Sequence, residues 1–449
     1  MAESTAIKKK SGRGRGFRCV TGTTLSLMSG AFSYSTFSMI MVAFLEYSGF
    51  DAVQASFIFT AYSLGSMLSS LIFGPLVNRF SAKIVCAVFG LGPLAAYLAM
   101  AYCSNIYVIY VLAVFWGAVQ VMSGIQLHMV LTNRWFTQGN GTIITLTSTV
   151  RKIVQLVYNP AIAAMVTALG FQKAATILGV GFFLLILVAA VFLINNGPGE
   201  EYETISFTSK KKEAKESGKK KAEQVDDGFE PAMSPAQLLR NPYVIVAIVA
   251  AAPIALASTM YYTNQSLIYA GAGLDLMQTS LLFSIGAASG MVISPLFGLT
   301  SDIIGSRKAL CIFLAIGVVM YLQFPVVGGY IGCGLLAAFC DIGNLNQYYA
   351  GVALPPLVGK KVTNTYIGWA NVVAALLCMF AAPIGASVAV AMGGNYAYTI
   401  MLCAVCFVIA IVLVWIALSD KARKSVREMD ANYRASHGIE QDSAEKPAA

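Results

Sequence analysis

The chain has 449 residues, of which 57% are hydrophobic and only 11% are charged. A soluble globular domain carries roughly 25% charged residues, so this composition cannot supply a water-facing surface, and we expect lipid to surround much of the chain. The formal net charge is +9. The lysines and arginines lie almost entirely in loops and tails between apolar runs, which argues against a nucleic-acid partner.

The first element is a basic segment, residues 1–19, followed by a long apolar run. This run is longer than the apolar part of a signal peptide and lacks a convincing cleavage site, so we interpret it as a first membrane-spanning helix. A spanning helix needs about 20 mostly apolar residues. Six such runs predict a bundle over residues 20–195, namely 20–47, 53–77, 83–103, 106–131, 142–168 and 174–195.

A charged stretch, residues 196–241, follows this first bundle. It contains two lysine triplets, 210–212 and 219–221, interleaved with acidic residues. Its apolar content is too low to form a core. We interpret it as a solvated cytoplasmic linker, and the alternative is a weak attraction to anionic lipid.

A second bundle is predicted over residues 242–418, from the six apolar runs 242–270, 276–301, 309–329, 331–356, 364–391 and 396–418. A charged tail, residues 419–449, ends the chain. The expected fold is therefore an all-α integral membrane protein with twelve transmembrane helices, arranged as two six-helix bundles.

The orientation follows from the lysines and arginines of the short loops, which accumulate on the cytoplasmic side. The opposite loops hold little more than Asp51, Lys173 and Asp275. The loops of the other set, with the tail, contain Arg79, Lys83, Arg134, Arg307, Lys308, Lys360, Lys361, Lys421, Arg423, Lys424 and Arg427. This alternation predicts a multi-pass protein of the cell membrane whose N-terminus, central linker and C-terminus are cytoplasmic.

One loop pattern occurs twice, each time after the second apolar run of a bundle. The first copy includes Gly74, Arg79 and Lys83, and the second includes Gly298, Asp302, Gly305, Arg307 and Lys308. A basic, tight-turning loop repeated at the same place indicates a duplicated bundle. Duplicated bundles with a site between their halves move solutes across membranes.

This loop resembles the G-x-x-x-D-x-x-G-x-[RK]-[RK] signature of the major facilitator superfamily. The second copy matches it closely. In the first copy Asn78 replaces the acidic residue and Ser81 replaces the second glycine. The resemblance, with the six-plus-six pattern, implies a secondary transporter in which the two bundles rock and the repeated loops act in the conformational change. It implies that helices one, four, seven and ten line the path.

Two further segments resemble one branch of that superfamily. Asn133-Arg134-Trp135-Phe136, followed by Gly141, is similar to the segment after the fourth helix in oxalate:formate antiporter-like and monocarboxylate transporter-like proteins, and Phe283 to Pro295 is similar to their eighth helix. The resemblance implies a small organic anion, a mono- or dicarboxylate, carried by proton symport or by anion exchange. Such relatives often have a basic residue just before the proline, where this chain has Ser294. Efflux of a neutral or amphipathic compound is therefore the alternative.

Arg151 is the leading candidate for binding an anionic substrate. It lies well inside the fifth apolar run, on the same helical face as Thr147, Ser148, Gln155 and Tyr158. The planar guanidinium offers two parallel donors to a carboxylate. A buried ion pair with Asp341, or a bond to a carbonyl, is the alternative for Arg151.

Two titratable residues are candidates for coupling or gating. Asp341 lies near the middle of the tenth run, where a carboxylate could take up a proton and couple transport to a proton gradient. A structural, hydrogen-bonded role is the alternative. His128, in the fourth run, could relay protons because histidine titrates near neutrality, and an interfacial position is the alternative.

Polar and aromatic side chains of the first, fourth, seventh, tenth and eleventh runs complete the predicted site. With Arg151, the predicted substrate-binding residues are Gln155, Tyr34, Gln120, Tyr262, Gln265, Asn344 and Trp369. The sequence has no phosphate-binding G-x-x-x-x-G-K-[ST] loop and no metal-binding motif, so we expect no ATPase motor, cofactor or metal, and no enzyme. We expect a monomer whose partners are the substrate, a proton or counter-anion, and the bilayer. A receptor that binds without transporting is a different class that the sequence leaves open.

Overall fold

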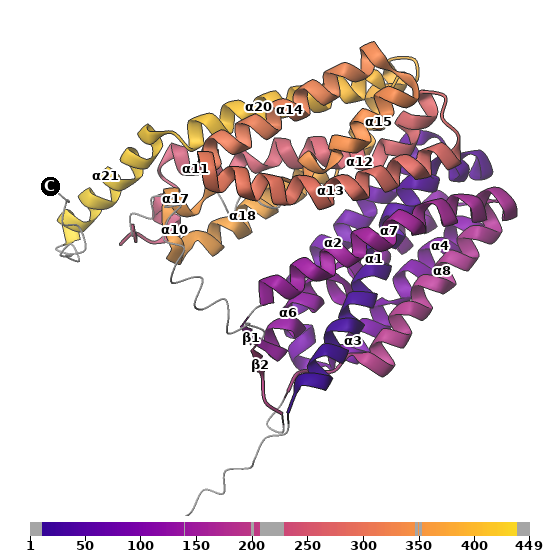
Figure 1. Cartoon of the computed structure of the whole chain (residues 1–449), viewed down its shortest axis with the longest axis horizontal. Helices are drawn as coiled ribbons and strands as arrows, with labels where there is room; N and C mark the ends of the chain where they lie inside the picture. Colours follow the sequence, from indigo (N-terminus) through magenta and orange to yellow (C-terminus); the bar gives the residue numbers. More distant parts are fainter. Residues whose placement is uncertain are drawn as a thin grey trace, which may run out of the picture. The chain divides into compact units, whose positions relative to one another are not determined.

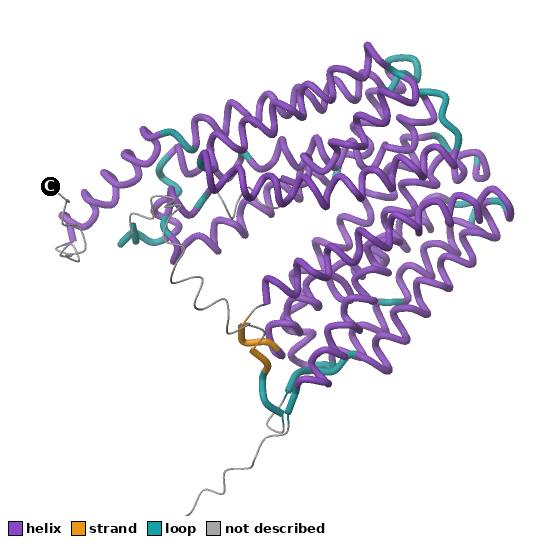
Figure 2. Tube along the Cα trace, viewed as in Figure 1, coloured by secondary structure: helices purple, strands orange, loops and turns teal. Residues whose placement is uncertain are grey.

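The computed structural model describes residues 11–138, 140–198, 202–206, 229–345, 349 and 353–437. These residues form two compact units (Figure 1). Unit 1 consists of the described residues within Met1–Lys220, Gln265–Ala270 and Asp275–Ser284, and unit 2 of those within Lys221–Asn264, Gly271–Leu274 and Ile285–Ala449. Nearly all of the described chain is helical, with two short strands (Figure 2).

Helices α1 to α8 belong to unit 1. In chain order the elements are α1 (Arg13–Ser48), α2 (Ala52–Arg79), α3 (Ala82–Phe89), α4 (Leu91–Tyr102), α5 (Ile106–Val119), the π-helix η1 (Gln120–Gly124), α6 (Ile125–Trp135), β1 (Phe136–Gln138), α7 (Asn140–Leu169), α8 (Phe171–Val188), the π-helix η2 (Ala189–Leu193) and β2 (Ile205–Ser206). Local signals set several boundaries. Asp51 and Gln54 form a capping box before α2, and the Asn105 side chain caps α5.

The later elements begin after the linker. They are α10 (Pro235–Leu238), α11 (Pro242–Val249), α12 (Ala251–Gly271), α13 (Leu276–Ile304), α14 (Ser306–Val327), α15 (Gly329–Phe339), the 3₁₀-helix η3 (Cys340–Asn344), α17 (Pro355–Val358), α18 (Lys360–Cys378), α19 (Ala381–Ala391), α20 (Ala397–Ala417) and α21 (Asp420–His437). In unit 2, α14 packs against α20, and α11 packs against α18 and α20. The rings of Tyr321 and Phe407, 5.2 Å apart, lie in the α14–α20 contact.

Eleven helical stretches of the described chain are long and apolar enough to cross a membrane. They match eleven of the twelve predicted runs and agree with the predicted all-α membrane fold. The remaining run, 331–356, contains α15, η3 and α17, and residues 346–348 and 350–352 within it lie outside the described residues. The regular helix gives way to η3 at Cys340, where the polar residues of this run begin. Short 3₁₀ stretches of this kind occur often at helix ends.

Helix α1 is central in unit 1, since it contacts α6, α7, α8 and both π-helices. A buried apolar cluster lies at one end of this helix and includes Cys19, Leu127, Trp135 and Ile194. Large apolar side chains elsewhere on the helices are exposed, for example Val157 at 76%. Exposed apolar surface of this kind suits a helix bundle surrounded by lipid.

The charged stretch is held to unit 1 at its first described residues. Asn196 Oδ1 accepts hydrogen bonds from the backbone N–H of Ala82 at 2.7 Å and from Ser81 Oγ at 3.1 Å. Strand β2 then pairs with β1 in parallel, with Ile205 opposite Phe136. The described start of the predicted solvated linker is thus docked, because the Asn196 side chain supplies an acceptor to the start of α3. The lysine triplets lie outside the described residues.

Candidate functional site

The most connected group of predicted site residues lies in unit 2 around Asp341. The Asp341 side chain is buried, with 4% exposure. Its Oδ1 accepts from Asn344 Nδ2 at 2.6 Å, and its Oδ2 accepts from Ser294 Oγ at 3.0 Å. Asp341 and Asn344 come from η3, whereas Ser294 comes from α13. The carboxylate therefore has two neutral donors from two elements.

Tyr262 of α12 extends this network. Its hydroxyl donates to the Cys340 carbonyl at 3.0 Å and accepts from Asn344 Nδ2 at 3.3 Å. The structure thus brings together three predicted residues, Asp341, Asn344 and Tyr262. Sequence reasoning missed Ser294 as a partner of Asp341, because it treated this position only as one that lacks a base. The network therefore joins η3 to α12 and α13 through hydrogen bonds.

A second group lies in unit 1 and joins two predicted residues, Tyr34 and Gln120, through Tyr62. The Tyr62 hydroxyl donates to Gln120 Oε1 at 3.3 Å. The Tyr34 and Tyr62 rings have centroids 4.7 Å apart, and the Trp116 ring lies 4.8 Å from that of Tyr62. The sequence prediction missed Tyr62 because α2 is not among the helices implied to line the path. The group offers aromatic surface and an amide.

Gln120 begins the π-helix η1 between α5 and α6. One-turn π-helices are rare and occur frequently at functional sites. Helix α1 supports this turn, because Ser26 Oγ donates to the Ser123 carbonyl at 2.6 Å. The π-helical turn is therefore held by a hydrogen bond from α1, and Gln120 at its start lies beside Tyr62.

Arg151 and Gln155 are both half-buried and lie one turn apart on α7. The polar stripe predicted for this helix faces α1 at two levels. Thr147 Oγ1 lies 3.5 Å from Thr24 Oγ1, and the Tyr158 hydroxyl lies 2.8 Å from Thr36 Oγ1. Arg151 lies between these two levels at helical spacing, so it belongs to the same face of α7.

The other three predicted residues, Gln265, His128 and Trp369, each contact a different side chain on a neighbouring turn or helix. Gln265 is buried, and its Nε2 donates to Tyr269 Oη at 2.8 Å. His128 is fully buried, and its Nδ1 lies 2.9 Å from Thr23 Oγ1. Trp369 is half-buried and packs edge to face against Tyr366, with ring centroids 5.2 Å apart.

The two repeated loops differ in backbone conformation. Gly305 has a φ of 86° before α14, a left-handed value that favours glycine. Ser81, at the same place in the first copy, has a φ of −61° before α3 and needs no glycine. The departure of the first copy from the signature therefore has a local structural reason.

The basic residues of the loops lie at helix ends. Arg79 is exposed at the last residue of α2, and Lys83 and Lys308 are exposed in the first turns of α3 and α14. Arg307 Nη2 donates to the Trp415 carbonyl at 3.0 Å, and its guanidinium carbon lies 3.9 Å from the centre of the Trp415 ring. Arg307 thus ties α14 to α20. Gly74 and Gly298 are exposed within α2 and α13, and the Asp302 side chain lies outside the described part of the structure.

The described residues contain no cluster of three or more His, Cys, Asp or Glu side chains that could hold a metal ion.

Several solved structures share this fold. A bacterial homolog of the human lysosomal transporter Spinster matches with a TM-score of 0.63 and 12% identity, covering 94% of this chain and 99% of the other. A peptide transporter POT matches with a TM-score of 0.65 and 14% identity, covering 93% and 99%. The nucleoside transporter NupG matches with a TM-score of 0.63 and 12% identity, covering 90% and 98%.

No curated protein shows significant sequence similarity to this chain. The family model described as Major Facilitator Superfamily matches residues 23–382, which is most of the chain and includes parts of both units. The chain therefore belongs to the major facilitator superfamily.

Proposed function

We propose that this transporter carries a small organic anion, a mono- or dicarboxylate, across the cell membrane by alternating access, as a proton symporter or an anion exchanger. One observation carries the proposal: each unit has an ionisable side chain away from its basic loops, Arg151 in the spanning helix α7 and the buried Asp341 in η3 of the tenth predicted run. Charges at membrane depth are costly and mark substrate or proton pathways. We also propose a monomer with both termini and the linker in the cytoplasm.

Arg151 is assigned to the substrate carboxylate. Its place on the polar face of α7, between the Thr147 and Tyr158 contacts to α1, supports this assignment. A guanidinium can donate two parallel hydrogen bonds to a carboxylate. The competing assignment is a structural ion pair or a bond to a carbonyl.

Asp341 is assigned to coupling. Its carboxylate accepts hydrogen bonds from the Ser294 hydroxyl of α13 and the Asn344 amide of η3. Protonation removes the charge and weakens both bonds. Proton uptake at Asp341 would therefore change the contact between η3 and α13, which is the kind of local change that can bias a conformational equilibrium.

The test of the substrate class is counterflow in proteoliposomes, with radiolabelled oxalate, formate and lactate as probes. Arg151→Ala should reduce exchange of the accepted carboxylate by about 100-fold, since a bond to a charged group contributes about 1.5–3 kcal/mol and the site would keep an unneutralised anion. Arg151→Lys should restore part of the rate, because lysine keeps the charge without the planar fork. Unchanged exchange in Arg151→Ala would remove the role assigned to this residue.

Efflux of a neutral or amphipathic compound is the second candidate. The aromatic group of Tyr34, Tyr62 and Trp116 favours it, because this surface offers apolar contact beside the Gln120 amide. The similar structures include a peptide transporter and a nucleoside transporter, so the fold by itself selects no substrate class. Uptake of an amphipathic dye into inside-out vesicles, with no carboxylate exchange, would favour this candidate.

A further inference from the structure

Helix α21, which follows the last spanning helix, carries a buried carboxylate. Ala422, Val426 and Asp430 are the buried residues of this helix and lie four residues apart, so they form one stripe. Ala422 and Val426 are apolar, whereas Asp430 brings a carboxylate with only 2% exposure to the end of the stripe. A buried carboxylate is costly unless it is paired and hydrogen-bonded.

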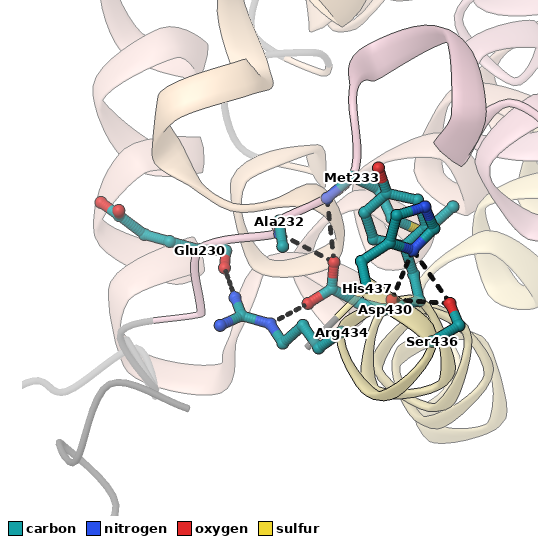
Figure 3. A network of polar contacts seen from close by, with 8 residues as sticks. Glu230, Ala232, Met233, Asp430, Arg434, Ser436 and His437 are labelled. Atoms are coloured by element: carbon teal, nitrogen blue, oxygen red, sulfur yellow. Dashed lines mark hydrogen bonds and ion pairs between the residues drawn. The ribbon is translucent and has the colours of Figure 1, made fainter. Parts of the chain in front are cut away.

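The partners of Asp430 come from the end of the linker (Figure 3). Oδ1 accepts the backbone N–H groups of Ala232 at 2.8 Å and Met233 at 3.2 Å. Oδ2 forms an ion pair with Arg434 Nε at 2.8 Å. Arg434 also donates to the Glu230 carbonyl. One carboxylate and one guanidinium therefore bind three successive parts of the linker backbone to α21.

The segment 229–241 is also held along its length. Asn241 Nδ2 donates to Ser425 Oγ of α21 at 3.0 Å, and the Arg427 guanidinium lies 5.7 Å from the Phe229 ring. On its other side, Tyr366 of α18 donates to the Pro235 carbonyl at 2.9 Å. The segment thus lies between α21 and the beginning of α18.

We infer that segment 229–241 and α21 form a latch, closed by Asp430, that holds the beginning of α18 and thereby controls substrate handling. Asp430 binds Ala232, the chain leads from Ala232 to Pro235, and Pro235 binds Tyr366. The Tyr366 ring packs against Trp369, which is a predicted substrate-binding residue. The latch is a regulatory element of the carrier, and its effect on substrate rests on the proposed function.

The latch is expected to affect substrate affinity and not proton coupling. Opening the latch breaks the hydrogen bond between Tyr366 and Pro235, whereas the Asp341 network keeps its own partners on α13 and η3. The position of Trp369 is then less restrained, so the affinity for substrate falls while proton coupling persists. Binding or modification of α21 would therefore change the affinity for substrate without any contact with the substrate.

The test uses hydrogen exchange and transport of the full-length protein, with Asp430→Asn as the opening variant. Exchange at Ala232 and Met233 should rise about tenfold or more, because two bonds to a charged acceptor are weakened. Exchange at the beginning of α18, Thr363–Ala370, should rise as well. Glu428→Gln is the matched control, since Glu428 is exposed on the same helix, and it should leave both regions unchanged.

Tyr366→Phe provides a second, independent opening of the same path, because it removes only the hydroxyl that binds Pro235 and keeps the ring against Trp369. Each variant should raise KM for the accepted probe, oxalate, formate or lactate, by about fivefold or more, which is the range of energetic coupling between sites. The double variant should show no further increase, because both changes break one path.

The outcomes separate the latch from the proposed function. Unchanged hydrogen exchange at residues 229–241 in Asp430→Asn overturns the latch. Faster hydrogen exchange there overturns its control of the site if hydrogen exchange in α18, or the KM for substrate, stays unchanged. If the wild-type protein carries none of the three probes, the carboxylate proposal fails, and the exchange at Thr363–Ala370 still decides whether the latch holds α18.

Discussion

At the scale of single residues, the candidate site depends on neutral donors around a carboxylate. Asp341 accepts from Ser294 and Asn344, and Tyr262 joins them through Asn344. A serine at position 294 donates a hydrogen bond to the carboxylate and brings no charge of its own. The coupling role proposed for Asp341 rests on its place in the tenth predicted run, because carboxylates at membrane depth mark proton or ion pathways.

Asp341→Asn should uncouple transport from the proton gradient. An amide cannot take up or release a proton, so an inward gradient that stimulates uptake by the wild-type protein should have no effect on the variant. Exchange of labelled carboxylate without a gradient should persist, because Asn retains the acceptor for Ser294. The measurement is uptake with and without an inward proton gradient of roughly 2 pH units, which corresponds to about 2.7 kcal/mol of driving force per proton. Gradient-stimulated uptake by Asp341→Asn would contradict the coupling role.

Gly359→Ala should destabilise unit 2. Gly359 has a φ of 83°, and a Cβ there would lie 2.5 Å from the Phe229 carbonyl oxygen and 2.8 Å from Pro231 Cδ. Strain at such a position costs about 1–3 kcal/mol, so the apparent Tm should fall by several degrees. Gly368→Ala is the control, because no atom lies within 4 Å of its Cβ position and alanine favours the helix. Equal Tm values for the two variants would argue against the packing of segment 229–241 on α18.

At the scale of elements, irregular helices position the candidate residues. The π-helix η1 begins at Gln120, and the 3₁₀-helix η3 contains Asp341 and Asn344. The π-helix η1 joins α5 to α6, whereas η3 follows the end of α15. One-turn π-helices inside α-helices are frequent at functional sites, and short 3₁₀ stretches are frequent at helix ends. Each unit therefore presents its polar group from a local departure from α-helical geometry.

Ser26→Ala tests the support of η1 by α1. The change removes a hydroxyl that donates to the Ser123 carbonyl at 2.6 Å and lies 3.2 Å from Cys86 Sγ, and the loss of a buried hydrogen bond should cost about 0.5–1.5 kcal/mol. Because Gln120 begins the same turn, the KM for the accepted substrate should rise together with the loss of thermal stability. Ser35→Ala, which removes only a bond to Phe32 within α1, is the comparison. If both variants behave alike, η1 has no special dependence on Ser26.

At the scale of the whole molecule, the predicted topology places both ends of the chain and the linker on one side of the membrane. Epitope tags at the N-terminus and within residues 210–221 should both be protected in intact cells and react with antibody only after permeabilisation. A tag in the loop near Asp275 should react in intact cells and serves as the control. Tags at the N-terminus and in the linker that report opposite compartments would contradict the six-plus-six arrangement.

Much of the architecture could be predicted because lipid imposes simple rules on sequence. A spanning helix needs about 20 apolar residues, and basic loops mark one side. Eleven of the predicted runs correspond to helices of sufficient length. The run 331–356 is described only in part, by α15, η3 and the start of α17, because residues 346–348 and 350–352 lie outside the described residues.

The candidate site was predictable only in part, for a physical reason. Polar residues at membrane depth are rare, so Asp341, Arg151 and Gln120 stand out in the sequence. Their partners Ser294 and Tyr62 do not, because serine and tyrosine are also common packing residues. Whether two such side chains meet depends on how each helix is rotated about its axis and where it crosses its neighbour.

The amino-acid sequence alone thus determined that lipid surrounds much of the chain. It also determined the two sets of apolar runs and the repeated basic loops, since each follows from local composition and spacing. Only the tertiary structure decided that Ser294 binds Asp341, that Tyr62 joins Tyr34 to Gln120, and that α21 binds the end of the linker. The Asp430 contacts join residues almost 200 positions apart, with a separation of 198 to Ala232. No local pattern encodes such a pairing, because it exists only once the helices between the two segments have packed.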